Sequence, residues 1–515
     1  MGKSVRTMAA LLGALWPAEA LAQEASEQSA GIGSVLRSMN QSFGARVVAP
    51  MADVLFFDLI FWDNGADGDL KLPFIVFWLI AGATFFTLRF GFINIRAFRH
   101  ALAVTAGHYD KAGDPGEVTH FQALSSALSA TVGLGNIAGV AVAVAVGGPG
   151  AVFWMIVAGF FGMSSKFAEV TLGQLYRETS ADGHILGGPM RYLQRGLTET
   201  GLPRLGRFLA VLFAVMCIGG SLGGGNMFQA NQSYAQVAFV VPALDNAWGA
   251  LVYGVVLATL VGLVIIGGIR RIGRVASIVV PAMVGIYLTA GLFIIITNAD
   301  QVGPAVGKIF GEAFDPRAGL GGLLGVLVTG FRRAAFSNEA GVGSASIAHS
   351  AAATNEPVRE GVVALLEPFI DTIVVCTMTG LVVVLTGAYE GGTEEGVLMT
   401  SKAFATVLPW FPKVLSLAVF LFAFSTMISW SYYGERCWTS LFGARTSIVY
   451  KVIFLLCVVL GSVLKLGNVI DFSDLMILGM AFPNILGVYI LSGKVSRELK
   501  SYWTRYRTGQ MQPER

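Results

Sequence analysis

Polar and glycine-rich residues interrupt two of the most apolar stretches of this sequence. The first interruption, residues 129–136, reads Ser-Ala-Thr-Val-Gly-Leu-Gly-Asn, and the second, residues 329–343, contains Arg-Arg-Ala-Ala-Phe-Ser-Asn-Glu-Ala-Gly. Glycine weakens a helix by about 1 kcal/mol relative to alanine, so both stretches predict helices that break. A broken helix offers N–H groups that can receive a carboxylate and carbonyl groups that can ligate a cation such as Na⁺. Glycines that only allow close helix packing are the alternative.

A third polar feature lies near residue 425. Phe422, Ser425 and Thr426 stand at positions i, i+3 and i+4, so they share one helical face and offer one carbonyl and two hydroxyls. Hard oxygen donors suit a hard cation, although such hydroxyls can also bond back to their own helix. Trp430 follows Thr426 by one further turn on the same face, where it can wall a small pocket or serve as core packing.

Amide side chains gather in a fourth place, residues 223–232, which reads Gly-Gly-Gly-Asn-Met-Phe-Gln-Ala-Asn-Gln. A buried amide needs a hydrogen-bond partner, and a polar amino acid ligand can be one. Asn226 and Gln229 are the favoured candidates, but the sequence does not choose firmly between Gln229 and Gln232.

The elements that carry these residues are membrane helices. Of the 515 residues, 54% are hydrophobic and 13% are charged, whereas about 25% of residues are charged in soluble domains. The hydrophobic residues form long blocks, and a membrane-spanning helix needs about 20 mostly apolar residues. The sequence therefore predicts an all-α polytopic protein of the lipid bilayer, and the unbroken blocks exclude the alternation of a β-barrel. The net charge of +3 is too small to indicate a nucleic-acid partner.

The blocks predict eleven spans, and the two interruptions fall in the second and the seventh. These spans cover residues 72–94, 121–147, 150–177, 205–238, 248–268, 276–297, 320–346, 361–387, 411–436, 446–464 and 474–493. Interrupted helices in corresponding positions of two halves are typical of transporters built from inverted repeats, with the binding site near the bilayer midplane. We therefore expect a five-plus-five repeat with broken first helices, residues 121–297 and 320–493, preceded by one extra span at 72–94, within a transporter domain at 71–493.

The N-terminal residues resemble a targeting segment. Lys3 and Arg6 precede an apolar stretch and the small-residue pattern Ala20-Leu21-Ala22, which predicts a signal peptide over residues 1–22; an uncleaved anchor is the alternative. Residues 23–70 then form a periplasmic segment with an interfacial helix. Most of the remaining Lys and Arg residues fall on one side of the predicted spans, and cytoplasmic loops carry such an excess. This predicts a bacterial inner-membrane protein with a cytoplasmic tail at 494–515.

Several charges lie inside predicted spans, where each is a functional hypothesis by default. Lys166 and Glu169 are three residues apart and can neutralise each other as a structural pair. The sequence assigns no definite role to the others, which are Arg332, Arg333, Glu339, Glu367 and Asp371.

Four segments, residues 131–139, 147–150, 225–227 and 336–341, resemble the alanine/glycine:cation symporter family, also called sodium:alanine symporters. The resemblance runs from about residue 72 to residue 492. It implies the five-plus-five fold of the amino acid/polyamine/organocation superfamily. It also implies Na⁺-coupled uptake of alanine or glycine, with Na⁺ as the coupling ion and no cofactor.

The resemblance also implies roles for particular residues. The backbone of residues 131–135 would hold the substrate, and the carbonyls of Ser129 and Val132 would face a Na⁺ completed from the ninth span. The substrate set is Thr131, Gly133, Leu134, Gly135, Asn226, Gln229, Phe331, Phe336, Thr426 and Trp430. The Na⁺ set is Ser129, Val132, Asn136, Phe422, Ser425 and Thr426.

Other functions remain less favoured. A channel usually needs a filter repeated over several subunits, and an enzyme needs a metal or nucleophile site, which the five histidines do not form at any His-x-x-x-His spacing. We therefore expect a transporter rather than an enzyme. A proton gradient is the alternative to Na⁺, and the oligomeric state is unknown from the sequence.

Overall fold

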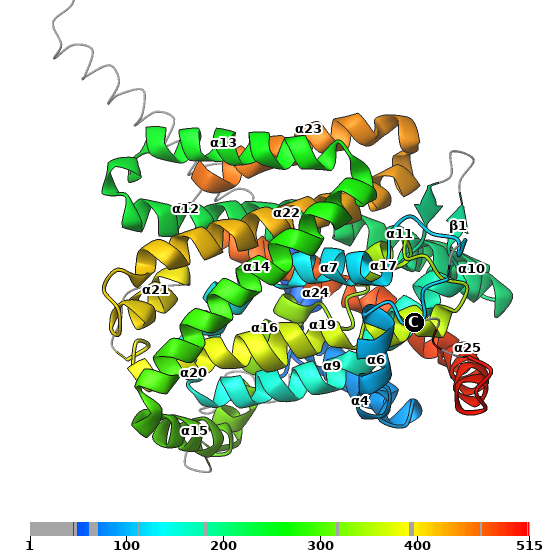
Figure 1. The fold of residues 1–515 in the computed structure, drawn as a ribbon, viewed down its shortest axis with the longest axis horizontal. Helices are drawn as coiled ribbons and strands as arrows, with labels where there is room; N and C mark the ends of the chain where they lie inside the picture. Colours follow the sequence, from blue (N-terminus) through cyan, green and yellow to red (C-terminus); the bar gives the residue numbers. More distant parts are fainter. Residues whose placement is uncertain are drawn as a thin grey trace, which may run out of the picture. The chain divides into compact units, whose positions relative to one another are not determined.

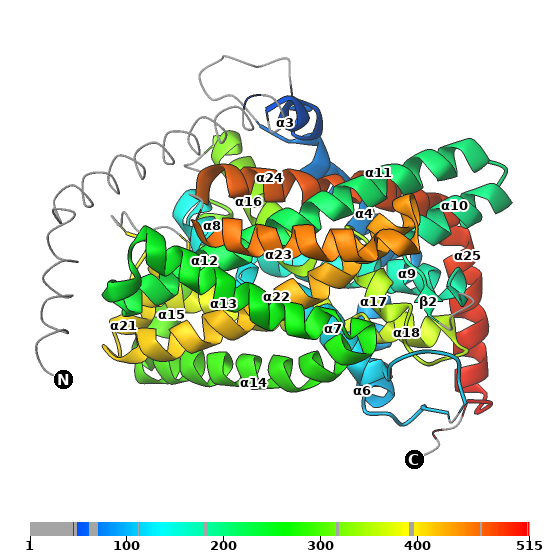
Figure 2. The same cartoon turned by 90° about the horizontal axis from the view of Figure 1, so that it is seen from above.

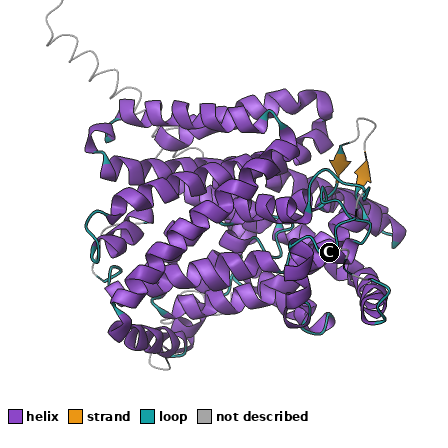
Figure 3. Cartoon of the chain, in the orientation of Figure 1, coloured by secondary structure: helices purple, strands orange, loops and turns teal. Residues whose placement is uncertain are grey.

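The computed structural model describes residues 45, 49–60, 71–111, 113–179, 184–315, 319–390, 396–463, 466–511 and 513. The predicted signal peptide and most of residues 23–70 lie outside these residues, apart from helix α3 (Ala49–Leu55) within the expected interfacial segment. The chain divides into two units, Met1–Val54 and Leu55–Arg515. The second unit is almost entirely helical (Figure 3), as its sequence predicts.

Eight helical segments among the described residues are long and apolar enough to cross a membrane. Because each contains a window of 18 residues with high hydropathy and at most two charges, burial in lipid is their stable state. The all-α polytopic prediction is therefore confirmed. The eight are α9 (Gly150–Leu175), Pro203–Val240, α13 (Ala247–Ile265), α14 (Gly268–Thr297), Pro357–Thr386, α22 (Phe411–Phe442), Ala444–Val463 and Asp471–Arg507.

Four of these segments consist of more than one helical part, and a fifth contains a proline. Pi-helical turns interrupt two of them, and such turns occur often at functional sites. The parts are α11 (Pro203–Leu222), η4 (Gly223–Met227) and α12 (Phe228–Val240); α18 (Pro357–Val363), α19 (Leu366–Pro368), η7 (Phe369–Cys376) and α20 (Thr377–Thr386); η8 (Ala444–Thr446) and α23 (Ser447–Val463); and α24 (Leu466–Gly479) and α25 (Ala481–Arg507). Proline at position 281 lies inside α14.

Both predicted breaks are present. Helix α7 (His120–Thr131) ends at the first interruption, and the chain resumes as the π-helical η3 (Gly135–Gly139) and α8 (Val140–Gly147) after a 50° bend. Helix α16 (Gly319–Asn338) ends at the second, and α17 (Ala345–His349) follows it. Gly341 and Gly343 have φ values of +86° and +94°, which glycine adopts readily. Glu339 also has a positive φ, +55°, where a side chain is strained.

Shorter elements join the long helices. A 16-residue apolar helix, α4 (Phe74–Arg89), stands at the first predicted span. Each of the eleven predicted spans thus contains helix, but their number and the internal repeat stay predictions. The remaining elements are α5 (Ile93–Arg96), α6 (Phe98–Thr105), the antiparallel strands β1 (Glu178–Thr179) and β2 (Ile185–Leu186), α10 (Pro189–Glu199), η5 (Pro242–Leu244), α15 (Ala299–Ala313) and α21 (Val397–Ala405).

Two long helices organise the packing within the second unit. Helix α9 packs against α4, α16, α18 and η7, and α22 packs against α7, α11, α12 and α14. Figures 1 and 2 show α22 running beside α14 and α7, with α9 close to α16. The first break therefore faces α22, whereas the second rests on α9.

A backbone connection joins the segment before α7 to the segment after α17. Val118 and Ala352 form an isolated parallel bridge. The guanidinium of Arg177, at the end of α9, donates to the carbonyl oxygens of Pro115 at 2.9 Å and Ala352 at 2.6 Å. It also donates to those of Ser350 and Thr354, at 3.1 and 2.5 Å. One side chain thus holds both segments.

Candidate functional site

The first break frees two backbone amides, and side-chain oxygens accept from both. Gly133 N donates to Asn136 Oδ1 at 2.8 Å, and Leu134 N donates to Gln229 Oε1 at 3.1 Å. Buried N–H groups without such partners are rare and costly. Asn136, a member of the predicted Na⁺ set, thus caps an amide of the break, and Gln229 holds the break from α12.

The structure brings Gln229, and not Gln232, to the first break. Gln229 Nε2 donates to the carbonyl of Gly224 at 2.9 Å, so both ends of its amide are fixed. Gln232 turns elsewhere, because its Oε1 accepts from the backbone N–H of Val397 at 3.1 Å. Spacing along one helix does not show which of the two amides reaches the break, whereas the hydrogen bond with Leu134 identifies Gln229 as the one that does.

Thr426 faces the same break from α22. A Cβ added to Gly133 would lie 2.5 Å from Thr426 Oγ1 and 3.3 Å from Gln229 Oε1, so only glycine fits there. Thr426 Oγ1 is buried and has no hydrogen-bond partner within the described part of the chain. An unpartnered buried hydroxyl is costly, which marks this position as one where a ligand can bind.

Ser129 and Ser425 also lie together, as predicted. Ser129 Oγ donates to the carbonyl of Ser425 at 2.6 Å, across from α7 to α22. Ser425 Oγ donates to the carbonyl of Phe422 at 3.0 Å, which is the bond back to its own helix that the sequence left open. All three residues are buried, and so is Val132 at the end of α7. Their role as cation ligands stays a prediction.

A carboxylate that the sequence left without a role joins the two breaks. Asp371, in the π-helical η7, accepts from Asn136 Nδ2 at 2.6 Å and from Ser337 Oγ at 3.0 Å. Thr372 Oγ1 donates to it at 2.7 Å. Asn136 lies in the first break and Ser337 in the last turn of α16, so one buried side chain contacts both.

The sequence contains only a weak signal that Asp371 lies between the two breaks. Its position inside an apolar span marked it as functional, but its neighbour at i−4, Glu367, carried the same mark. The π-helical η7 turns the side chains of Glu367 and Asp371 toward different partners, and residue spacing does not predict such a turn. Asn338, next to Ser337, fixes the same junction, because its Nδ2 donates to Thr372 Oγ1 at 2.9 Å.

Large aromatic rings lie on η4. The Trp430 ring fills the place of a Cβ at Gly225, and the Phe336 ring approaches the Cβ position of Gly224 to 3.4 Å. Both rings are buried, at 2% and 6% exposure. Trp430 and Phe336 therefore both pack on the backbone of η4, and their role as pocket walls stays a prediction. The glycines of η4 let these rings approach the backbone.

Two residues of the predicted substrate set point elsewhere. Asn226 Nδ2 donates to the carbonyl of Phe454 in α23 at 2.7 Å. Phe331 lies beside Trp154 of α9, with ring centroids 6.4 Å apart. Gly135 faces the second break, where a Cβ would meet Ser337 Cα at 3.3 Å, and Thr131 Oγ1 bonds back to Ala127 at 3.2 Å. Asn226 and Phe331 thus contact the surrounding helices.

Lys166 lies within electrostatic reach of Glu169, as the sequence allows, but its ion-pair partner comes from another span. Lys166 Nζ lies 3.1 Å from Glu367 Oε2, whereas Glu169 accepts from Asn484 Nδ2 at 2.8 Å. Residues three apart on a helix are neighbours, but the tertiary partners decide the pairing of buried charges. Arg332 and Arg333 both pair with Asp474 of α24, Arg332 at 2.6 Å.

Comparisons with known proteins identify a family and a fold for this chain. Residues 63–515 match the model of the Sodium:alanine symporter family. The sodium/alanine symporter AgcS of Methanococcus maripaludis is 41% identical over 84% of this chain and 94% of its own. The amino-acid carrier protein AlsT of Bacillus subtilis is 34% identical over 86% of this chain and 92% of its own. The solved structure of MhsT in complex with L-phenylalanine covers 74% of this chain and 89% of its own, with a TM-score of 0.52 and 17% identity, so the fold is shared.

Proposed function

Because the chain belongs to the sodium:alanine symporter family, we propose that it takes up alanine or glycine together with Na⁺. The family resemblance read from residues 72–492 is confirmed, and the chain is a Na⁺-coupled amino acid symporter and an integral membrane protein. The family is one of transporters, so we propose that the chain has no enzymatic activity and needs no cofactor besides Na⁺ as its coupling ion.

We propose that the substrate binds at the first break. The backbone at Thr131, Gly133, Leu134 and Gly135 would hold its carboxylate and amine, since a helix break offers N–H and carbonyl groups that a polar ligand can use. The carboxylate would take the place of Asn136 Oδ1 and Gln229 Oε1 as acceptor from the amides of Gly133 and Leu134. The unpartnered Thr426 hydroxyl and the fixed amide of Gln229 support this position. The contacts of Asn226 and Phe331 make them supports of the surrounding helices.

Two places in the same region suit a hard cation. The first would be formed by five members of the predicted Na⁺ set, Ser129, Val132, Phe422, Ser425 and Thr426; Asn136 belongs to the second. Within it, Ser129 Oγ donates to the Ser425 carbonyl and Ser425 Oγ to the Phe422 carbonyl. Each would supply oxygen, the ligand type that alkali and alkaline earth cations prefer.

The second place is the carboxylate of Asp371 with Asn136 and Ser337. An ionised carboxylate offers about four lone-pair positions, so the donors of Asn136, Ser337 and Thr372 leave it able to contact a cation. Its bonds reach both breaks. A cation there would tie the two halves of the transporter together.

The predicted topology supports an orientation. We propose that the protein lies in a bacterial inner membrane with its C-terminal tail in the cytoplasm and its N-terminal segment, after removal of residues 1–22, in the periplasm. The excess of Lys and Arg in the connections that would then face the cytoplasm supports this. The end of the protein that carries Asp110, His184 and Arg177 is cytoplasmic in this orientation.

The observation that carries the proposal is the first break, held by Asn136 and Gln229 against an unpartnered Thr426 hydroxyl. We expect purified protein in liposomes to accumulate labelled alanine when Na⁺ is higher outside than inside. The measurement is initial uptake with Na⁺ or with choline outside, with and without an imposed proton gradient. Uptake that is unchanged in choline and needs the proton gradient would overturn Na⁺ coupling.

A pocket wall should set the size of the substrate. We expect Trp430→Ala to weaken alanine uptake and to let leucine and valine compete better, because the deleted indole leaves an apolar cavity that larger side chains fill. The measurement is inhibition of labelled alanine uptake by each amino acid. Trp438→Ala is the matched control, since Trp438 lies in the same helix and donates to Thr446 Oγ1 at 2.9 Å. Unimproved competition by leucine and valine would return Trp430 to core packing.

A further inference from the structure

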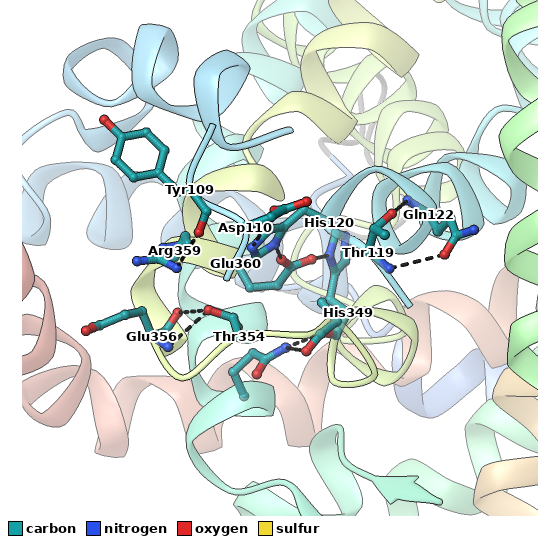
Figure 4. Close-up of polar contacts among 12 residues, drawn as sticks. Tyr109, Asp110, Thr119, His120, Gln122, His349, Thr354, Glu356, Arg359 and Glu360 are labelled. Atoms are coloured by element: carbon teal, nitrogen blue, oxygen red, sulfur yellow. Dashed lines mark hydrogen bonds and ion pairs between the residues drawn. The ribbon is translucent and has the colours of Figure 1, made fainter. Parts of the chain in front are cut away.

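A chain of buried acidic and basic side chains runs from a loop into the core, apart from the site described above. It begins at Asp110, which is 45% exposed and lies 3.8 Å from His120 Nε2. His120 Nδ1 bonds Glu360 Oε2, and Glu360 Oε1 lies 2.5 Å from His349 Nδ1. Figure 4 shows these four side chains lying toward one another, from the loop before α7, from α7, from α18 and from α17.

The chain continues to Lys166. His349 Nε2 lies 2.6 Å from Glu367 Oε1, and the other oxygen of Glu367 lies 3.1 Å from Lys166 Nζ. His120 is 1% exposed, and the four groups beyond it are fully buried. Lys166 Nζ is close enough for an ion pair, but it makes no hydrogen bond among the described residues.

His349 is the centre of this chain, because a carboxylate contacts each of its ring nitrogens. An imidazole donates from both nitrogens only when it is protonated. The two bonds can therefore be made together only if the imidazole carries an extra proton or if one carboxyl does. This position binds a proton whichever group holds it.

The charge balance of the region leads to the same conclusion. Four buried carboxylates, three basic side chains and a phenol lie within electrostatic reach of one another here. The carboxylates are Glu360 of α18, Glu367 of α19, Glu339 of the second break and Glu169 of α9. The basic side chains are Lys166 of α9, His120 of α7 and His349 of α17, and the phenol is Tyr433 of α22. Arg177, at the end of α9, lies within electrostatic reach of Glu360. Buried charges without a counter-charge are costly, so the excess carboxylate favours bound protons.

We propose that Asp110, His120, Glu360, His349, Glu367 and Lys166 form a proton relay, through which His349 exchanges a proton with the solution at the loop end of the transporter. The proton is thus a ligand in addition to Na⁺ and the amino acid. Its binding changes the charge next to Lys166 and the hold of α18 and α19 on α17.

The steps move one proton and break no other bond. A proton taken up from solution at the exposed Asp110 passes to His120 Nε2, 3.8 Å away, through one bridging water. The proton on His120 Nδ1 then passes to Glu360 Oε2. A half-turn of the Glu360 carboxyl presents that proton to His349 Nδ1. His349 becomes an imidazolium that donates to Glu360 and Glu367, and Glu360 returns to a carboxylate.

The electrostatics of His349, which lies outside the eight spanning segments, set the pH at which this proton leaves. Burial disfavours the charged imidazolium, but the carboxylates of Glu367 and Glu360 raise the pKa of His349 to about 9. A raised pKa means that the bonds to both carboxylates are present below that pH and are lost as the pH rises through it. The two carboxylates then face a neutral ring, so the hold on α17 weakens.

The test is alanine uptake by the full-length protein in vesicles of known orientation, under a fixed Na⁺ gradient. The pH on one side is stepped from 7 to 10 while the other stays at 7, and the sides are then exchanged. We expect the wild-type rate to fall at least about threefold, with a midpoint near 9, when the pH on the side of Asp110 is raised. A step seen only when the pH on the other side is raised would overturn a relay that begins at Asp110. A flat rate on both sides would overturn the relay.

Variants separate the relay from a merely structural cluster. His349→Gln should remove the pH step, and Glu360→Gln should move its midpoint to lower pH, because one of the two carboxylates that raise the pKa of His349 is gone. His184→Gln, an exposed histidine near the same end, should keep the wild-type step. A step retained in His349→Gln, or a midpoint unmoved in Glu360→Gln, would overturn the relay.

A second measurement follows the protonation of the histidine rings in the wild-type protein, so it depends neither on a transport assay nor on the folding of a variant. Nitrogen NMR of wild-type protein labelled at its five histidines should show one ring that stays protonated up to about pH 9. Burial lowers the pKa of His100 to about 4, so this histidine cannot account for such a signal. A spectrum with every ring neutral by pH 8 would overturn the relay even if uptake assays had failed for other reasons.

Discussion

Replacing Asp371 by asparagine is expected to raise the Na⁺ concentration for half-maximal alanine uptake by about tenfold or more. The change removes the charge of a buried carboxylate on which donors from both helix breaks converge. Hydrogen bonds to charged groups contribute roughly 1.5–3 kcal/mol each, and about 1.4 kcal/mol corresponds to a tenfold change in affinity. By linkage, the apparent affinity for alanine should fall at low Na⁺ and recover as Na⁺ is raised.

The measurement is a Na⁺ titration of alanine uptake, normalised to protein in the membrane. Thr379→Val is the matched control, since Thr379 lies in the next helix of the same span and shares a buried hydrogen bond of 2.8 Å with Tyr287. It should lower the amount of folded protein without moving the Na⁺ midpoint. An unmoved midpoint in the Asp371 variant would assign this carboxylate to helix packing alone.

Alanine at position 133 is expected to abolish uptake. The added methyl would lie 2.5 Å from Thr426 Oγ1 and 3.3 Å from Gln229 Oε1, so the first break must move away from α22 and lose its bond with Gln229. Overpacking of this kind costs typically 1–3 kcal/mol, and here the displaced groups are those proposed to bind the substrate. We expect the uptake rate to fall by about a hundredfold while the protein still reaches the membrane.

A second glycine in the same segment gives the control. Gly139 lies at the end of η3 and has no atom within 4 Å of the position of an added Cβ. Gly139→Ala should therefore keep most of the uptake, measured as the initial rate per folded protein. Equal loss in both variants would mean that any added side chain disturbs the bent helix and that the close approach of Gly133 to Thr426 is unimportant.

The sequence predicted the breaks because their cause is local. Glycine at 133, 341 and 343 weakens the helix wherever the rest of the chain lies, so neither break needed knowledge of a partner. The group of Ser129, Phe422 and Ser425 was within reach for a similar reason, because helical spacing puts the last two on one face. Only the family resemblance indicated that Ser129 lies near Phe422 and Ser425.

What the sequence missed depends on contacts between distant segments. The sequence offers only the near neighbour Glu169 as a partner of Lys166, whereas the ion pair of Lys166 is with Glu367 of another span. Glu367 and Asp371 are four residues apart and look equivalent in a helix, but the π-helical turn sends one toward His349 and the other toward Asn136. No spacing rule gives that difference.

The bridge between Val118 and Ala352, held by Arg177, constrains how the protein can open. The segment entering α7 and the segment leaving α17 share backbone hydrogen bonds, so neither half-helix can slide past the other without breaking them. We therefore expect the two segments to tilt together, with the glycines at 133 and 341 as hinges. Any opening toward that end should then move both helix breaks together.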